Sequence, residues 1–221
     1  MPLPAVLASA SQHWKGIDYA WLFNQLIAAM SLSTEKLAAF FKSEFPLNHE
    51  GLEELLAAFE TKTFGKHQLL LEEGQTETQL KFLVSGLVRE YYATEEKEIN
   101  LSFYTASEFI TDFSSFYKDY PSRKFQQCLK PVTLQVLRKD RFLELLEKYQ
   151  CGKQVVEMSF QRLLEKKERQ DFDRMTKAPE LLYQDLLRYK AKWLAEVPQY
   201  HIAAYLGVTP ETLSRIRKRI S

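Results

Sequence analysis

Hydrophobic residues in the first quarter of the chain recur three or four positions apart, which is the spacing of a helix that buries one face. This pattern predicts helices over residues 17–30 and 33–45, and Pro46 ends the second of them. Asn48 then offers an N-cap side chain to a third helix, whose apolar residues again lie on one side. Such stripes are more typical of a core or a subunit contact than of a cofactor site.

From Thr61 the spacing changes to short apolar runs that are separated by turn residues. The runs occupy residues 68–71, 80–84, 87–92, 99–104, 125–129 and 132–137. Gly74 and Gly86 fall in the turns between them, where a positive φ is expected. Short strands at this spacing predict an antiparallel β-roll or small barrel, and not a parallel sheet.

Helical spacing returns in the C-terminal part of the chain. Asp140 is expected to cap one helix, and a long helix is predicted over about 153–175. Pro179 opens a further helix that is predicted to run to about residue 195, and Pro198 separates it from the last elements.

The long helix has an apolar seam in its first half and an almost entirely charged second half. The seam consists of Val156, Phe160 and Leu163, which are spaced four and three positions apart. A single seam with no further helix to bury it predicts a dimer helix. A core helix that packs on its own domain is the alternative.

The residues from Gln199 to the end predict two short helices joined by a tight turn. Gly207 follows the first helix, where a left-handed conformation costs little. Thr209 and Pro210 suit the N-cap and first position of the second helix. The inward positions are Ile202, Ala203, Leu206, Leu213 and Ile216. This combination predicts a helix-turn-helix whose second helix enters the major groove of DNA, and an ordinary surface hairpin of helices is the alternative.

The outward face of that second helix carries the residues that we expect to contact DNA. They are Thr209, Glu211, Thr212, Ser214, Arg215, Arg217, Lys218 and Arg219. From Thr209 onward four basic side chains stand against one acidic side chain, so this segment can neutralise phosphates. Cations that stabilise the C-terminal end of a helix are the structural alternative.

The composition is that of a soluble globular protein, with 45% hydrophobic and 27% charged residues. A net charge of +1 excludes a nucleic-acid polycation. Cys128 and Cys151 are too few for a disulfide framework, so we expect a reducing compartment and free thiols, with a single disulfide as the alternative. The first twelve residues lack the charged start of a signal peptide, and no stretch is long enough to span a membrane. We therefore expect a cytoplasmic protein with no membrane partner.

Two parts of the chain resemble one family of proteins. Leu69–Gln75 with Phe82–Tyr91 is similar to its strand, Glu-Gly turn, strand, Ser-Gly turn and strand, and Ile202–Ile216 is similar to its DNA-binding unit. On these residues the chain resembles the Crp/Fnr family of bacterial transcription regulators. The resemblance implies a homodimer joined through the long helix, an effector pocket in each roll, and a two-fold symmetric double-stranded DNA site. It also allows RNA polymerase as a partner.

The predicted fold is α+β and is divided into four parts. They are an N-terminal helical extension (1–46), a cyclic-nucleotide-binding-like antiparallel β-roll (47–150), a dimerisation helix (151–175) and a helix-turn-helix domain (176–221). Ser221 follows directly on the predicted recognition helix, so we expect no C-terminal wing. The function expected from this order is sequence-specific DNA binding in transcription regulation.

The resemblance also implies which residues read bases. Glu211 matches the family's recognition glutamate, which accepts from a cytosine amino group, and Arg215 matches the arginine that donates to guanine. The chemistry fits without the family, because these are the pairings that the two side chains favour in the major groove. An intrahelical ion pair between the two is the alternative. Pro210 stands where the family often has a basic residue, which implies fewer or different directly read bases.

The expected effector pocket departs from the family's cyclic-nucleotide cassette. Thr111 stands where glycine is expected, Asp112 replaces glutamate, and Ser122 and Arg123 occur in reversed order. The aromatic residues that could fill the pocket themselves are Phe113, Phe116, Tyr117 and Tyr120. We therefore expect another small effector, or none, in place of cyclic AMP.

No cofactor, metal site or catalytic group is identified from the residues. The N-terminal region contains no cysteine for an iron–sulfur cluster, and His49 and His67 are isolated. The chain shows no nucleophile–base grouping and no P-loop, which argues against an enzyme. The remaining alternative is a ligand- or protein-interaction module with a vestigial helix-turn-helix, which would not select DNA sequences.

Overall fold

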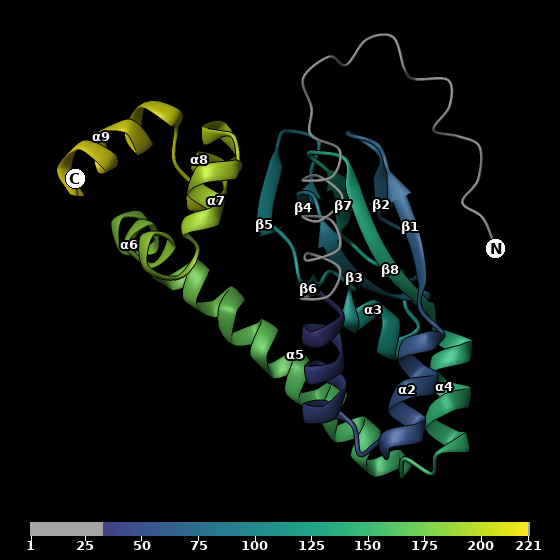
Figure 1. The fold of residues 1–221 in the computed structure, drawn as a ribbon. Coiled ribbons are helices and arrows are strands. Elements are labelled where there is room, and N and C mark those ends of the chain that lie inside the picture. Colours follow the sequence, from purple (N-terminus) through teal and green to yellow (C-terminus); the bar gives the residue numbers. More distant parts are fainter. Residues whose placement is uncertain (1–32, 221) are drawn as a thin grey trace, which may run out of the picture.

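The computed structural model describes residues 33–220, and the helix predicted over 17–30 lies outside the described residues. Figure 1 shows an antiparallel β-roll, a group of helices at one end of it, and the long helix α5, which crosses to the C-terminal helices α6–α9. This arrangement confirms the predicted α+β class and the order of its parts.

The roll consists of two four-stranded antiparallel sheets, with strand orders β1-β8-β3-β6 and β2-β7-β4-β5. The strands are β1 (Glu60–Phe64), β2 (Leu69–Leu71), β3 (Gln79–Ser85), β4 (Val88–Ala93), β5 (Glu98–Tyr104), β6 (Glu108–Phe109), β7 (Phe125–Cys128) and β8 (Val132–Arg138). Six of them were predicted, whereas β1 and β6 were not. Gly86 sits between β3 and β4 with φ 108°, and an added Cβ would meet the carbonyl oxygen of Pro131.

The helices follow the predicted pattern, except that α3 was not predicted and that two further points need correction. They are residues 33–44, α2 (His49–Ala57), α3 (Phe113–Lys118), α4 (Lys139–Lys148), α5 (Lys153–Thr176), α6 (Pro179–Tyr189), α7 (Ala191–Glu196), α8 (Gln199–Leu206) and α9 (Pro210–Ile220). The prediction that Asp140 caps α4 is wrong, because Asp140 lies inside the first turn and binds Arg138 instead. The single helix predicted from Pro179 is two helices, because the backbone leaves helical geometry at Lys190.

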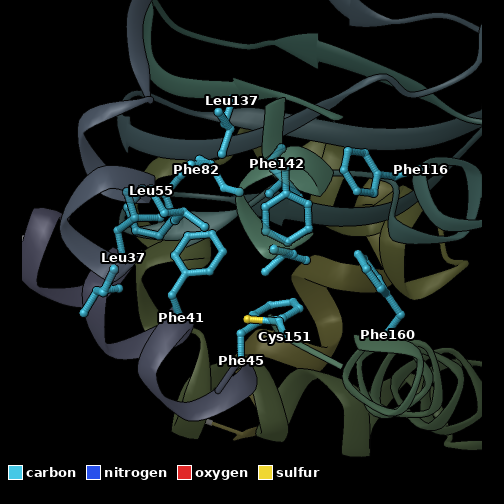
Figure 2. Close-up of a cluster of buried hydrophobic side chains, with 14 residues drawn as sticks. Leu37, Phe41, Phe45, Leu55, Phe82, Phe116, Leu137, Phe142, Cys151 and Phe160 are labelled. Carbon is cyan, nitrogen blue, oxygen red and sulfur yellow. The ribbon is translucent and has the colours of Figure 1, made fainter. Parts of the chain in front are cut away.

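Phe160 of α5 is part of the core of its own chain. Only 2% of the residue is exposed, and its ring stacks on Tyr117 with a centroid distance of 4.8 Å. Figure 2 shows Phe160 facing a cluster of rings and aliphatic side chains from the N-terminal helix, α2 and α4. Val156 and Leu163 pack against the same cluster. The predicted dimer seam is therefore wrong for Phe160, and a core helix, which was the alternative, describes this face of α5.

The opposite side of α5 carries large apolar residues that are exposed to solvent. They are Val155, Met158, Phe172 and Met175, which are 40%, 56%, 64% and 72% exposed. Charged residues lie between the two apolar ends of this face, for example Arg162 and Arg169. We call these residues the outer face of α5.

The C-terminal helices pack on the roll at the edge strand β5 (Figure 1). A second buried cluster joins Leu87, Phe103 and Leu129 of the roll to apolar side chains of α6–α9. Phe103 of β5 lies edge-to-face against Trp193 of α7, with a centroid distance of 5.2 Å. Because this contact covers an otherwise exposed strand edge, it also removes a template for unwanted strand pairing.

Candidate nucleic-acid interface and ligand cavity

The unit formed by α8 and α9 has the local geometry that the sequence predicted. Gly207 adopts the left-handed conformation with φ 69°, and the Val208 N–H donates to the Ala203 carbonyl oxygen at 3.0 Å. The backbone N–H of Thr212 donates to Thr209 Oγ1 at 3.3 Å, so Thr209 acts as the N-cap of α9. The inward residues Ile202, Ala203, Leu206, Leu213 and Ile216 are all at most 4% exposed. The turn and both helix faces are thus defined by packing as well as by hydrogen bonds.

The opposite face of α9 presents its polar side chains to solvent. Glu211, Ser214, Arg215 and Lys218 are exposed, and no direct ion pair joins Glu211 to Arg215 in the described structure. The pKa of Glu211 is lowered by a backbone N–H at the start of the helix, by the Thr209 hydroxyl and by the nearby charge of Arg215. The Glu211 carboxylate is therefore ionised, and both side chains are open to a ligand on this face.

The remaining predicted contact residues differ in their surroundings. Thr212 is half-buried and shares a hydrogen bond with Thr209. Arg219 is bound to Glu180 of α6 at 2.6 Å, so it is less available as a phosphate contact than predicted. Arg217 is exposed on the same helix end. Arg215 and Lys218 are both exposed, so we compare Arg215 as a base-reading residue of α9 with Lys218 as a phosphate contact.

His201 of α8 holds the unit against the roll. Its ring Nδ1 lies 3.3 Å from the side-chain nitrogen of Asn100 on β5, and that nitrogen also donates to the His201 carbonyl oxygen at 3.1 Å. Burial, together with the charge of Arg89, lowers the pKa of His201 from 6.5 to about 4. A neutral ring with Nδ1 as acceptor fits this contact.

We expect this contact to weaken in acid. The folded pKa of His201 lies below the unfolded value, so the unfolded chain binds the proton first and stability falls as the pH drops from about 6.5 to about 4. Thermal unfolding measured across this range should lose part of its pH dependence in His201→Gln. His49→Gln, at a histidine whose side chain is 87% exposed, should retain that dependence. An unchanged profile in His201→Gln would contradict the assignment.

A cavity of about 320 Å³ lies between the roll, the N-terminal helix and α5. Its wall combines apolar side chains such as Phe40 and Leu163 with carboxylates and lysines. Asp112 lines it, and its carboxylate accepts hydrogen bonds from Ser122 at 2.8 Å and Lys124 at 3.1 Å. The Asp112 carboxylate, at the expected ribose-binding position, is therefore already hydrogen-bonded to side chains of the chain itself.

Glu90 is a second carboxylate in this cavity that the sequence analysis missed. Its side chain is 2% exposed and lies 3.2 Å from Lys167 of α5 and 3.9 Å from Lys124. Burial alone would raise its pKa, but the two lysines and the Gln126 amide lower the pKa to about 2. No local motif marked Glu90, because its lysine partners come from distant parts of the chain. Glu90 and Asp112 thus compensate the charges of Lys124 and Lys167 inside the cavity.

The other predicted pocket residues lie elsewhere. Arg123 is exposed and does not line the cavity, which corrects its assignment. Of the four aromatic residues expected to fill the pocket, Phe113 alone lines the cavity. Phe116 and Tyr117 belong to the core around Phe160, and Tyr120 is 42% exposed. The cavity is consequently more open and more charged than the sequence suggested.

Both cysteines are buried free thiols, as expected. Burial raises the pKa of Cys128 to about 11 and also raises that of Cys151, so both stay protonated at neutral pH. Within residues 33–220 no group of three His, Cys, Asp or Glu side chains is arranged to hold a metal ion. In the same part of the chain, no helix has the length and apolar character needed to cross a membrane.

Comparison with known proteins assigns the roll and the overall fold. Residues 61–149 match the family described as cyclic nucleotide-binding domain. Similar solved structures include FixK2 from Bradyrhizobium japonicum, with a TM-score of 0.60, 16% identity, and coverage of 73% of this chain and 84% of that chain. A CooA variant from Carboxydothermus hydrogenoformans has a TM-score of 0.55, 18% identity, and coverage of 80% and 86%.

A third similar structure is the c-di-GMP responsive global regulator CLP from Xanthomonas campestris. It has a TM-score of 0.56 and 15% identity, and the match covers 78% of this chain and 91% of that chain. No curated protein sequence matches this chain. At such identities the structures establish a common fold.

The chain therefore carries a cyclic nucleotide-binding domain, joined to a long helix and a C-terminal helical unit. This is the fold of the Crp/Fnr regulators, so the resemblance noted from the sequence is confirmed for the domain and for the fold.

Proposed function

We propose that this protein is a sequence-specific DNA-binding transcription regulator that acts as a homodimer on a two-fold symmetric site. The proposal rests on the α8–α9 unit, in which Thr209 caps α9 and the apolar residues of the inward face are buried. Glu211 and Arg215 lie on the opposite, exposed face, where they can reach base edges. The regulator fold of the similar structures supports the same function.

The outer face of α5 is the proposed dimer contact, in place of the seam predicted from the sequence. Met158 and Phe172 are large apolar side chains exposed on one helix, and such residues are enriched in subunit interfaces. Pairing two copies along α5 would leave the roll free as a sensor domain. The recognition helices of such a dimer would need a separation of about 34 Å to enter successive major grooves on one face of DNA.

Selection from a random duplex library by the purified protein tests this function. An enriched palindrome is the expected result, and the half-site should contain a guanine and a cytosine within reach of Arg215 and Glu211. Salt-sensitive binding without enrichment, both alone and with candidate effectors, would contradict sequence-specific regulation. It would favour the interaction module with a vestigial helix-turn-helix.

Arg215→Ala and Lys218→Ala should weaken DNA binding in different ways. Loss of a bidentate contact to guanine should cost about 1–3 kcal/mol and relax the preference at one base pair. Loss of the Lys218 contact to a phosphate should weaken binding to all sequences about equally. It should also reduce, by about one, the slope of log affinity against log salt concentration. We would measure the binding of both variants to the selected site and to single-base changes of it, at several salt concentrations. This distinguishes a base contact from a phosphate contact. Identical behaviour would remove the base-reading role from Arg215.

We call the cavity between the roll, the N-terminal helix and α5 the cavity beneath α5, and we also propose that it does not bind cyclic AMP. Asp112 is held by Ser122 and Lys124, and Lys124 also faces Glu90, so this cation of the cavity wall already has two carboxylates beside it. Entry of a phosphate would require separation of these buried pairs. Isothermal titration with millimolar cyclic AMP should show no saturable heat. A saturable signal that Lys124→Gln removes would overturn this part of the proposal.

A further inference from the structure

A second cavity, of about 370 Å³, lies where the roll, α5 and the C-terminal helices meet. Leu101 and Ser102 of β5 form one wall, and the end of α5 forms another. Leu182 and Trp193 belong to the wall contributed by α6 and α7. We call it the junction cavity. It adjoins the cavity beneath α5, but Trp193 and Arg174 line the junction cavity and not its neighbour.

Two hydrogen-bond donors that belong to its lining residues have no acceptor. Trp193 is 3% exposed, and its indole Nε1 is buried without a hydrogen-bond partner. Arg174 Nε is likewise buried and unpaired. Buried donors are almost always satisfied in folded proteins, so two of them at one cavity indicate a missing acceptor.

The charges of the junction cavity point to a negatively charged ligand. Its acidic residues already have lysine partners, since Asp173 and Asp185 share Lys177 at 3.2 and 2.9 Å, and Asp171 lies 4.0 Å from Lys167. Within residues 33–220 Arg174 and Lys190 have no carboxylate partner, and Lys190 Nζ lies 5.0 Å from the centre of the Trp193 ring. The cavity therefore combines paired acids with two unpaired cations and an unpaired N–H donor.

The rest of the lining suits an apolar body attached to that negative group. Leu101, Leu182 and Leu186 are buried apolar residues, and the rings of Trp193 and Tyr205 meet edge-to-face at 5.3 Å. We propose that the junction cavity binds a small aromatic anion, whose carboxylate or phosphate accepts from Trp193 Nε1 and Arg174 while its ring packs on the leucines.

A ligand in this position would touch the roll, α5 and the DNA-binding helices at once. It would therefore bind more tightly to the arrangement in which these three walls are close together, and would shift the protein toward it. This regulatory consequence rests on the proposed DNA-binding function, whereas binding itself does not.

The indole N–H resonance of Trp193 in the full-length ¹⁵N-labelled protein gives a direct test. The chain has three tryptophans, and Trp193→Phe identifies the relevant signal by its loss. Benzoate and phenyl phosphate are the two anionic probes, and benzyl alcohol is the neutral control. We expect a saturable downfield shift of this resonance with at least one anion and none with the alcohol. The more effective anion distinguishes a carboxylate ligand from a phosphate ester.

Arg174→Gln should weaken the binding of that anion roughly tenfold, because a charged donor is lost. The matched control is Arg123→Gln, an exposed arginine of the roll that lines neither cavity, which should bind as the parent does. No saturable shift at millimolar probe concentrations, or equal binding by both variants, would overturn the proposal and leave water as the occupant. A shift that persists in a protein that selects no DNA would refute the regulator function and retain the site.

Discussion

Replacing Phe160 by alanine is expected to lower the free energy of unfolding by about 3–5 kcal/mol. Phe160 connects α5 to the rest of the chain, because its ring lies 5.9 Å from Phe116, 6.2 Å from Phe45 and 4.8 Å from Tyr117. Removing the ring leaves a cavity between three elements that cannot all move inward together. Urea unfolding followed by far-UV circular dichroism measures the loss.

Met158→Ala is the matched control for this substitution. Met158 lies on the same helix but is 56% exposed, so its loss from a monomer should change stability by no more than about 0.5 kcal/mol. In the proposed dimer, whose stability depends on protein concentration, the same substitution should instead raise the dimer dissociation constant. If Phe160→Ala altered dimer dissociation and left monomer stability unchanged, the seam predicted from the sequence would be correct after all.

Glu90→Gln is expected to cost about 2–4 kcal/mol at neutral pH, because it removes a buried charge and leaves Lys167 and Lys124 without this partner. The Glu90 carboxylate lies 3.2 Å from Lys167, so the substitution should also loosen α5 on the roll. The pKa of Glu90 is about 2 in the folded chain, against 4.5 as the ordinary value. Its contribution is thus fully present above about pH 4.5 and is lost as the pH falls toward 2.

The stability of parent and variant between pH 2 and pH 7 therefore tests Glu90, since these values bracket the two pKa values. The difference in unfolding free energy between parent and variant should shrink as the pH approaches the folded pKa of Glu90. Glu168→Gln, at an exposed position of α5, should follow the parent at every pH. A difference that stays constant with pH would show that Glu90 acts through packing and not through its charge.

The strands that the sequence analysis missed had weak local patterns. β1 has the sequence Glu-Thr-Lys-Thr-Phe, and it pairs on one side with β8, so little of it is buried. β6 has two residues and is defined by its pairing with β3. In both cases the partner strand decides the structure, because neither segment buries enough apolar surface to produce a recognisable alternation.

The cavities were harder to predict than the α8–α9 unit for a related reason. Asp112 could be located by its place in a local cassette, whereas Glu90, Lys124 and Lys167 come together only when β4, the segment before β7 and α5 meet. Arg123 and Lys124 are neighbours in the sequence, yet Lys124 faces the cavity and Arg123 faces solvent. A one-residue difference of this kind depends on side-chain direction, which composition and spacing do not report.

The sequence by itself determined the features that depend on neighbouring residues. Gly207, Thr209 and Pro210 define the turn of the α8–α9 unit through backbone conformation and capping, and the short apolar runs define most strands of the roll. The tertiary structure alone decided the role of Phe160, the pairing of Glu90 with Lys167, and the unpaired donors of Trp193 and Arg174. These depend on which distant surfaces meet, because burial and ion pairing are properties of the packed elements and not of any one segment.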